Sequence, residues 1–226
     1  KRKNITETIK NLSISDEKKK VLLKESTSFI NKTHGTLKED SAIEIYEKRF
    51  GIKLDTSQEF FKKHITTMDS KNFDWYIGGK LDGIYDDKEN PKNSYIVEVK
   101  NRTRGFFSAL RDYEKTQIHI YMYILSIPVA KLVEKYNDKI RITAIYQDDE
   151  YLNDVLEYLH IFSNGFENFL NDIEMKRRFV SSDESEKQII IRKLYLNKIN
   201  QVLNKRLQNQ LQDDLDDESC LINDDL

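Results

Sequence analysis

The 226-residue sequence contains a single cysteine, Cys220, so no disulfide framework can hold it together. This scarcity is typical of a reducing compartment, and we expect an intracellular protein of the cytoplasm or nucleus. No apolar run approaches the roughly 20 residues that a membrane-spanning helix requires, and the first ten residues lack the apolar core of a signal peptide. The chain begins with lysine rather than methionine, so the sequence does not exclude a preceding targeting segment, for example one that directs the protein to an organelle.

Charged residues make up 34% of the chain and its mean hydropathy is −0.70, yet aromatic residues account for 11% and are spread along it. Aromatic residues in that distribution indicate a folded protein, and the length suits one domain with appendages. We expect a flexible arm over residues 1–14, the main domain over 15–180, a helical appendage over 181–211 and an acidic tail over 212–226.

The net charge of −2 is unevenly distributed. Residues 212–226 contain seven acids and no base, so leaving out these seven negative charges changes −2 into +5 for residues 1–211. A mildly basic body is compatible with binding to a phosphate backbone. The acidic tail is expected to extend from that body, either to compete with DNA for the basic surface or to bind a protein partner.

The most informative charges lie in the stretch from Trp75 to Asn101. Its two runs rich in β-branched and aromatic residues, 76–85 and 95–99, flank a polar turn and predict a β-hairpin. If residues whose numbers sum to 180 face each other, Asp82 lies opposite Glu98. Two carboxylates at the roughly 4.5–5.5 Å of cross-strand neighbours repel each other, unless a cation lies between them or one is protonated.

Alternation along a strand adds a lysine to this pair of acids. Glu98 and Lys100 point to the same side, while Val99 points to the other and offers its backbone carbonyl as a hard oxygen ligand. Two carboxylates and a lysine indicate a metal-dependent nuclease centre. The alternative is an ordinary cross-strand cluster in which Lys100 neutralises acids on a half-exposed face.

The rest of the sequence predicts helices and further strands before and after this hairpin. It predicts helices over 15–30 and 36–50, strands within 52–65, a helix over 106–126, a hairpin of 130–136 with 140–146, and helices over 151–178 and 189–211. This order of elements predicts an α/β fold in which helices flank a central mixed β-sheet.

Four motifs follow one another along the chain: G-x-x-x-E (Gly35–Glu39), G-x-x-D-G (Gly79–Gly83), E-V-K (Glu98–Lys100) and Q-x-x-x-Y (Gln117–Tyr121). In this order they resemble the PD-(D/E)xK nuclease superfamily, and within it the RecB-like and lambda-exonuclease-like branch that includes YqaJ-type viral recombinases. The resemblance covers about residues 31–170 and implies a restriction-endonuclease-like core. Leu81 stands where the superfamily's name has proline, and the arginine segment with which lambda-type exonucleases hold a 5′-phosphate is not found.

The resemblance implies a role for each matched residue. Lys100 would orient or help deprotonate the attacking water, and Gln117 would support the site. Glu44 competes with Glu39 as the acid from the helix, and Glu39 is preferred for its spacing from Gly35. The implied metal ligands are Glu39, Asp82, Glu98 and the carbonyl of Val99.

The implied cofactor is Mg²⁺ or Mn²⁺, because oxygen ligands suit these ions and none of the four histidines is spaced like a zinc ligand pair. The predicted function is a metal-dependent DNA nuclease, an exonuclease of recombination, repair or replication. The alternatives are an endonuclease or RNA-directed nuclease of the same superfamily, or a catalytically silent nucleic-acid-binding or scaffold protein. The sequence does not determine whether the protein forms an oligomer. The candidate nucleic-acid contacts are Lys62, Lys63, Arg102, Arg104, Arg111, Lys115 and Tyr121.

Overall fold

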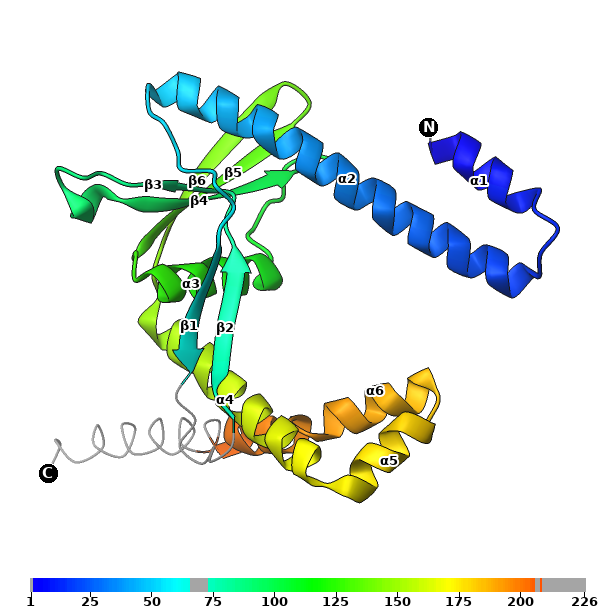
Figure 1. Ribbon diagram of the computed structural model, residues 1–226. Helices are drawn as coiled ribbons and strands as arrows, with labels where there is room; N and C mark the ends of the chain where they lie inside the picture. The colour runs from blue at the N-terminus through cyan, green and yellow to red at the C-terminus, as the bar shows by residue number, and fades with distance from the viewer. Residues whose placement is uncertain (1, 66–72, 206–207, 209–226) are drawn as a thin grey trace, which may run out of the picture. The chain divides into compact units, whose positions relative to one another are not determined.

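The computed structural model describes residues 2–65, 73–205 and 208 (Figure 1). The acidic tail predicted for 212–226 lies outside these residues. The chain divides into two compact units, one of Lys1–Phe61 with Gly78–Asp148, the other of Lys62–Ile77 with Asp149–Leu226. No described helix is both long enough and apolar enough to cross a membrane.

A mixed four-stranded sheet lies at the centre of the first unit. Its strand order is β3 (Gly83–Tyr85), β4 (Tyr95–Asn101), β5 (Val129–Tyr136) and β6 (Lys139–Tyr146). The inner strands β4 and β5 are parallel, and each edge strand is antiparallel to its neighbour. Parallel neighbours need a crossover connection, which the chain makes through a helix between β4 and β5. The predicted α/β fold with a mixed sheet flanked by helices is confirmed at this level.

Helices cover the two faces of this sheet: α2 (Asp16–Phe50) and α3 (Asp112–Leu125). Side chains alternate along β4, so Val97 and Val99 are buried in one cluster with α2, while Ile96 is buried with α3. The even-numbered residues Glu98 and Lys100 therefore lie on the α3 side.

The helix α2 is continuous through residues 31–35, where we predicted a turn between two helices. Both predicted ends are confirmed. The Ser15 hydroxyl accepts the Lys18 N–H, and Gly51 ends the helix in the left-handed conformation at φ +64°. The predicted interruption is wrong because one glycine inside a helix costs only about 1 kcal/mol, which the cooperativity of a long helix outweighs.

A further helix, α1 (Arg2–Lys10), forms where we predicted a flexible arm. Ile5 and Ile9 are four residues apart and so share one side of this helix, and Ile9 is buried. The helix contacts α2, and this tertiary contact explains why a polar terminal segment is helical.

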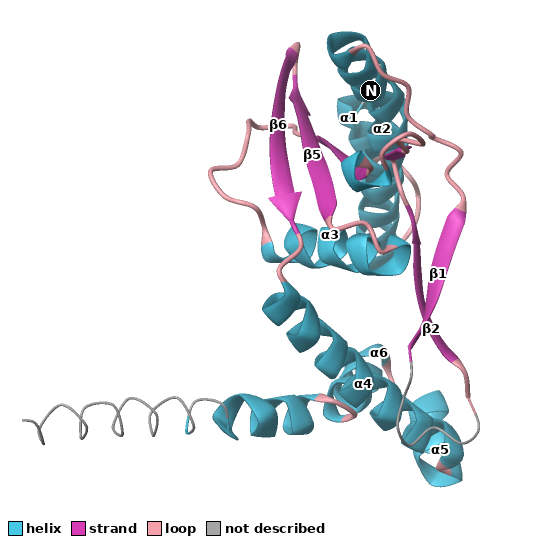
Figure 2. Ribbon diagram, turned by 90° about the vertical axis from the view of Figure 1, so that its left-hand side faces the viewer, coloured by secondary structure: helices cyan, strands magenta, loops and turns pink. Residues whose placement is uncertain are grey.

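The predicted strand 76–85 is two strands. The first, β2 (Trp75–Lys80), pairs with β1 (Phe60–Ile65) in a separate two-stranded sheet (Figure 1, Figure 2). The second, β3, pairs with β4 as predicted for the hairpin. The predicted strand is interrupted at Leu81, whose side chain is buried in an apolar cluster with Ile118 and Met122 of α3. The pairs Gly83↔Val97 and Tyr85↔Tyr95 confirm the predicted register, in which paired numbers sum to 180. A short 3₁₀ helix, Pro91–Asn93, lies within the connecting turn.

The later elements differ from prediction at their ends and in the interruption of two predicted helices. The helix α3 begins at Asp112 rather than at 106, and the β5–β6 hairpin is confirmed, with Asn137 at φ +52° in its turn. The predicted helix 151–178 is interrupted at Asp172, whose carboxylate accepts the Met175 N–H and starts a new helix. The described helices of the second unit are α4 (Asp149–Asn171), α5 (Ile173–Ser181) and α6 (Glu184–Lys193). The predicted helix 189–211 is also divided, because α6 begins at Glu184 and a turn at 194 and 195 separates it from helical residues 196–205.

Candidate active site

The end of β4 places Glu98 and Lys100 beside α3. The Lys100 ammonium donates to Glu98 Oε1 at 2.5 Å and to Gln117 Oε1 at 3.1 Å. Gln117 in turn donates through Nε2 to the Tyr121 hydroxyl at 3.0 Å, one turn further along α3. Four of the predicted site residues are thus joined in one chain of hydrogen bonds.

Asp82 joins the same site from the break between β2 and β3. Its Oδ2 accepts the backbone N–H of Val99 at 2.7 Å, two residues beyond Val97, the last β4 residue that pairs with β3. The carboxylate of Asp82 thus replaces the missing strand partner. Because the N–H and C=O of one strand residue point to the same edge, the Val99 carbonyl is directed toward the edge that Asp82 occupies.

The carboxylates of the site disfavour one another's ionisation. Burial of Glu98, which is 2% exposed, and then the charge of Asp82 raise the pKa of Glu98 to about 7, against the opposing effect of Lys100. Burial also raises the pKa of Asp82. The pKa of Glu39 is raised by burial and then by the charge of Asp82. A cation among these groups would relieve both the repulsion and the loss of hydration.

Lys100 carries the opposite charge in the same surroundings. Burial by itself lowers its pKa, but the charges and hydrogen bond of Glu98, with the charge of Asp82, outweigh that effect and raise the pKa. The ammonium is therefore stabilised in its charged form. A charged ammonium can donate hydrogen bonds and stabilise nearby negative charge, but it holds its proton and so does not act as a base.

The oxygen atoms of the two central acids fit a hard cation. Asp82 uses one oxygen for Val99 and Glu98 uses one for Lys100. The other oxygen of Glu98, Oε2, is buried, and no group in the described part of the chain hydrogen-bonds to it. Over those residues no cluster of three or more His, Cys, Asp or Glu side chains forms a preassembled metal site. Mg²⁺, however, needs only one or two carboxylates because it retains several waters.

The structure distinguishes between the two candidate acids of α2, Glu39 and Glu44. Glu39 is half-buried, and its charge acts on Glu98. Glu44 lies on the same helix and is exposed. Glu39 is therefore the acid of α2 that interacts with the site.

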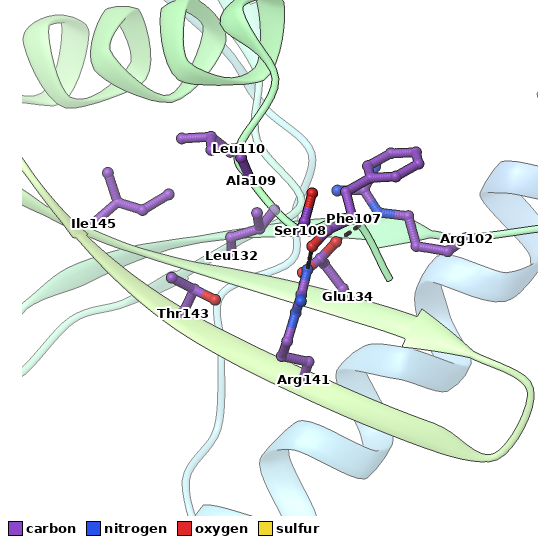
Figure 3. Close-up of a pocket in the computed structure, with 10 residues that line it drawn as sticks. All are labelled: Arg102, Phe107, Ser108, Ala109, Leu110, Leu132, Glu134, Arg141, Thr143 and Ile145. Carbon is purple, nitrogen blue, oxygen red and sulfur yellow. Dashed lines mark hydrogen bonds and ion pairs between the residues drawn. The ribbon is translucent and has the colours of Figure 1, made fainter. Parts of the chain in front are cut away.

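Arg102 is not a surface cation, which corrects its prediction as a phosphate contact. Its side chain is only 6% exposed and forms ion pairs with two buried glutamates, Glu114 and Glu134. Figure 3 shows Arg102 beside Glu134. The guanidinium donates to Glu134 at 2.7 Å and to both oxygens of Glu114 at 2.6 and 3.0 Å. Bidentate pairing of this kind uses the donors that a phosphate would need.

The other predicted nucleic-acid contacts lie in different surroundings. Arg104 and Arg111 are exposed, and the Arg111 guanidinium stacks 3.7 Å from the Phe107 ring centroid. The Lys115 ammonium donates to Asp148 at 3.2 Å. Lys62 and Lys63 belong to the second unit.

Tyr121, predicted to contact nucleic acid, is half-buried and packs against a glycine. A Cβ atom added at Gly79 would come within 2.6 Å of the Tyr121 ring. Gly79, the first glycine of the G-x-x-D-G motif, therefore leaves room for the Tyr121 ring beside the site.

The ion-pair network around Arg102 was not predicted from the sequence. Arg141 extends it by donating to Glu134 at 2.6 Å and to the Phe107 carbonyl at 2.6 Å. A cavity of about 170 Å³ adjoins the network, walled by apolar groups that include Leu110, Leu132 and Ile145 (Figure 3). Leu132 and Val133 precede Glu134 as Ile96 and Val97 precede Glu98, so both acids follow two apolar strand residues. The partner of Glu134, Arg102, is distant in sequence, so sequence alone does not distinguish a structural acid from a catalytic one.

Substituting Arg102 by methionine is expected to destabilise the fold by about 3–5 kcal/mol, because Glu114 loses its bidentate partner while remaining fully buried. Urea denaturation would measure the change in the free energy of unfolding. Arg104→Met is the matched control, since Arg104 is exposed and its loss should change stability by no more than about 0.5 kcal/mol. Equal stabilities for the two variants would contradict the structural role of Arg102.

Comparisons with known proteins give little beyond this geometry. No protein family and no curated protein matches the chain. One solved structure, titled "Crystal structure of SSO0001", is 17% identical, with a TM-score of 0.43, over 67% of this chain and 79% of its own. The function of this chain must therefore be inferred from its own residues.

Proposed function

We propose that the chain is a metal-dependent nuclease that hydrolyses phosphodiester bonds of DNA, with the restriction-endonuclease-like core of the PD-(D/E)xK superfamily. The observation that supports it best is the convergence of Asp82, Glu98 and Lys100 at one strand end. There, one buried oxygen of Glu98 has no hydrogen-bond partner within the described residues. A purely structural ion pair would leave no reason to bury a third charge and an unsatisfied oxygen beside it.

The residues have separate roles in this proposal. Asp82 and Glu98 would hold Mg²⁺ or Mn²⁺, with Glu39 and the Val99 carbonyl as further ligands. When bound, the ion supplies positive charge that offsets the anionic phosphodiester and lowers the pKa of water.

The remaining side chains of the site act without contacting the ion. Lys100 orients the attacking water and stabilises the negative charge that develops on phosphate. Gln117 positions Lys100 by accepting its hydrogen bond, and Tyr121 fixes Gln117 from the next helical turn.

Incubating the protein with DNA tests the proposal and separates its variants. End-labelled linear DNA and closed-circular DNA should be compared in Mg²⁺, in Mn²⁺ and in a chelator. We expect metal-dependent loss of linear DNA while the closed circle stays intact, which is the behaviour of an exonuclease. Nicking of the circle would favour an endonuclease, and cleavage of RNA alone would favour the RNA-directed alternative.

Calorimetric titration with Mn²⁺ gives a second readout that does not depend on activity. Binding of Mn²⁺ that is lost in Asp82→Asn would place the ion at the proposed ligands. Binding without cleavage of any substrate would instead favour a catalytically silent nucleic-acid-binding protein. Roles in recombination, repair or replication, an intracellular location and a protein partner for the acidic tail remain parts of the same proposal.

A further inference from the structure

The strand ribbon β1–β2 carries an exposed tyrosine in the second unit. Trp75 of β2 packs edge-on against Phe166 of α4, with ring centroids 6.0 Å apart. Because successive side chains of a strand point to opposite faces, the next residue, Tyr76, points away from α4. Tyr76 is 51% exposed, in agreement with this direction.

Two side chains of β1 contact that tyrosine. The Lys62 ammonium lies 4.7 Å from the Tyr76 ring centroid, and the His64 ring meets the same tyrosine edge-on at 5.3 Å. One acid is also present, since Asp74 lies 3.6 Å from His64 Nε2. Single exposed aromatic residues are common, but an exposed ring in contact with a lysine and a histidine has the composition of a nucleic-acid stacking surface.

We propose that Lys62, His64 and Tyr76 form a contact for single-stranded nucleic acid, in which an unpaired base stacks on the exposed part of Tyr76 and Lys62 binds the adjacent phosphate. The inference rests on the proposed function only in taking nucleic acid as the ligand. Within a duplex each base is already stacked on its neighbours, so the face of a base reaches this tyrosine only when the strand is unpaired.

The charges predict opposite effects of neighbouring substitutions. Lys62 attracts the phosphate backbone, whereas Asp74 repels it. Lys62→Ala should weaken binding and reduce the steepness of log affinity against log salt concentration by about 0.7, the value for one phosphate contact on a single strand. Asp74→Asn should tighten binding. A general loss of folding would weaken binding in both variants, so the opposite signs separate the two explanations.

The test measures binding of a labelled single-stranded oligonucleotide to the full chain in chelator, where metal-dependent cleavage cannot occur. Tyr76→Ala should lower affinity about tenfold for the single strand and leave affinity for a blunt duplex unchanged. Tyr76→Phe keeps the ring and should bind like the unaltered protein. Tyr146→Ala is the matched control, since Tyr146 is 70% exposed on β6 of the other unit. DNA and RNA strands of one sequence distinguish the two sources of unpaired bases.

The outcomes separate this inference from the nuclease proposal. Unchanged single-strand affinity in both Tyr76→Ala and Lys62→Ala would overturn the contact, whether or not the protein cleaves DNA. Affinity that depends on Tyr76 in a protein that cleaves no substrate would support the contact and overturn the nuclease. Equal losses on single strand and duplex would also overturn the inference, because stacking on an unpaired base predicts a difference between them.

Discussion

Asp82→Asn is expected to reduce DNA cleavage by a factor of about a thousand or more, while DNA binding stays equal or becomes tighter. Loss of a carboxylate ligand removes several kcal/mol of electrostatic stabilisation from the transition state, and each 1.4 kcal/mol is roughly a factor of ten in rate. The asparagine keeps an acceptor oxygen for the Val99 N–H, so the local fold should survive. Removing one negative charge also eases the approach of phosphate.

Three measurements check this prediction. Single-turnover cleavage gives the loss of rate, and binding in chelator gives the affinity for DNA. Thermal unfolding without metal should show an unchanged or raised melting temperature, because Asp82 and Glu98 no longer repel each other. Asp138→Asn in the exposed β5–β6 turn is the matched control and should cleave normally. Substantial metal-dependent turnover by purified Asp82→Asn would exclude Asp82 as a metal ligand.

Lys100→Ala is expected to lower the rate of the chemical step by about 10² or more with little loss of metal affinity. The ammonium is 2.5 Å from Glu98 and 3.1 Å from Gln117, so its place beside the proposed nucleophile is restrained from two sides. Removing one restrained charged donor from a site where negative charge develops costs about 10²–10³ in other enzymes.

Single-turnover kinetics at saturating metal separate the role of Lys100 from binding. The exposed Lys139, at the start of β6, provides the control Lys139→Ala, which should keep the full rate. If Lys100→Ala cleaves at nearly the unaltered rate, Lys100 is a structural ion pair for Glu98. That result would also support the cross-strand alternative to a catalytic site.

Patterns among residues close together in the sequence predicted most of the local structure. The polar turn and the two flanking runs are consistent with a single register, and the structure pairs Gly83 with Val97 accordingly. Alternation along β4 placed Glu98 and Lys100 together. The predicted helix start at residue 15 and end at residue 50 agree with α2, because its caps, Ser15 and Gly51, depend on neighbouring residues only.

Long-range contacts decided the rest of the candidate site. Arg102, Glu114 and Glu134 are separated in the sequence, and only the packing of α3 and β5 around β4 turns a predicted phosphate contact into a buried ion pair. The hydrogen bond between Asp82 and the Val99 N–H likewise depends on the interruption between β2 and β3, where Leu81 packs in a cluster with Ile118 and Met122 of α3.

The sequence by itself therefore determined the α/β class, the hairpin register, the two ends of α2 and the acids and lysine of the candidate site. These features depend on hydrogen bonds and side-chain periodicity within a few residues, or across one turn. Only the tertiary structure decided which charges are buried, which lysines and arginines stay exposed, and that 76–85 divides between two sheets. The burial of a charge depends on every element packed around it, and those elements are distant in sequence.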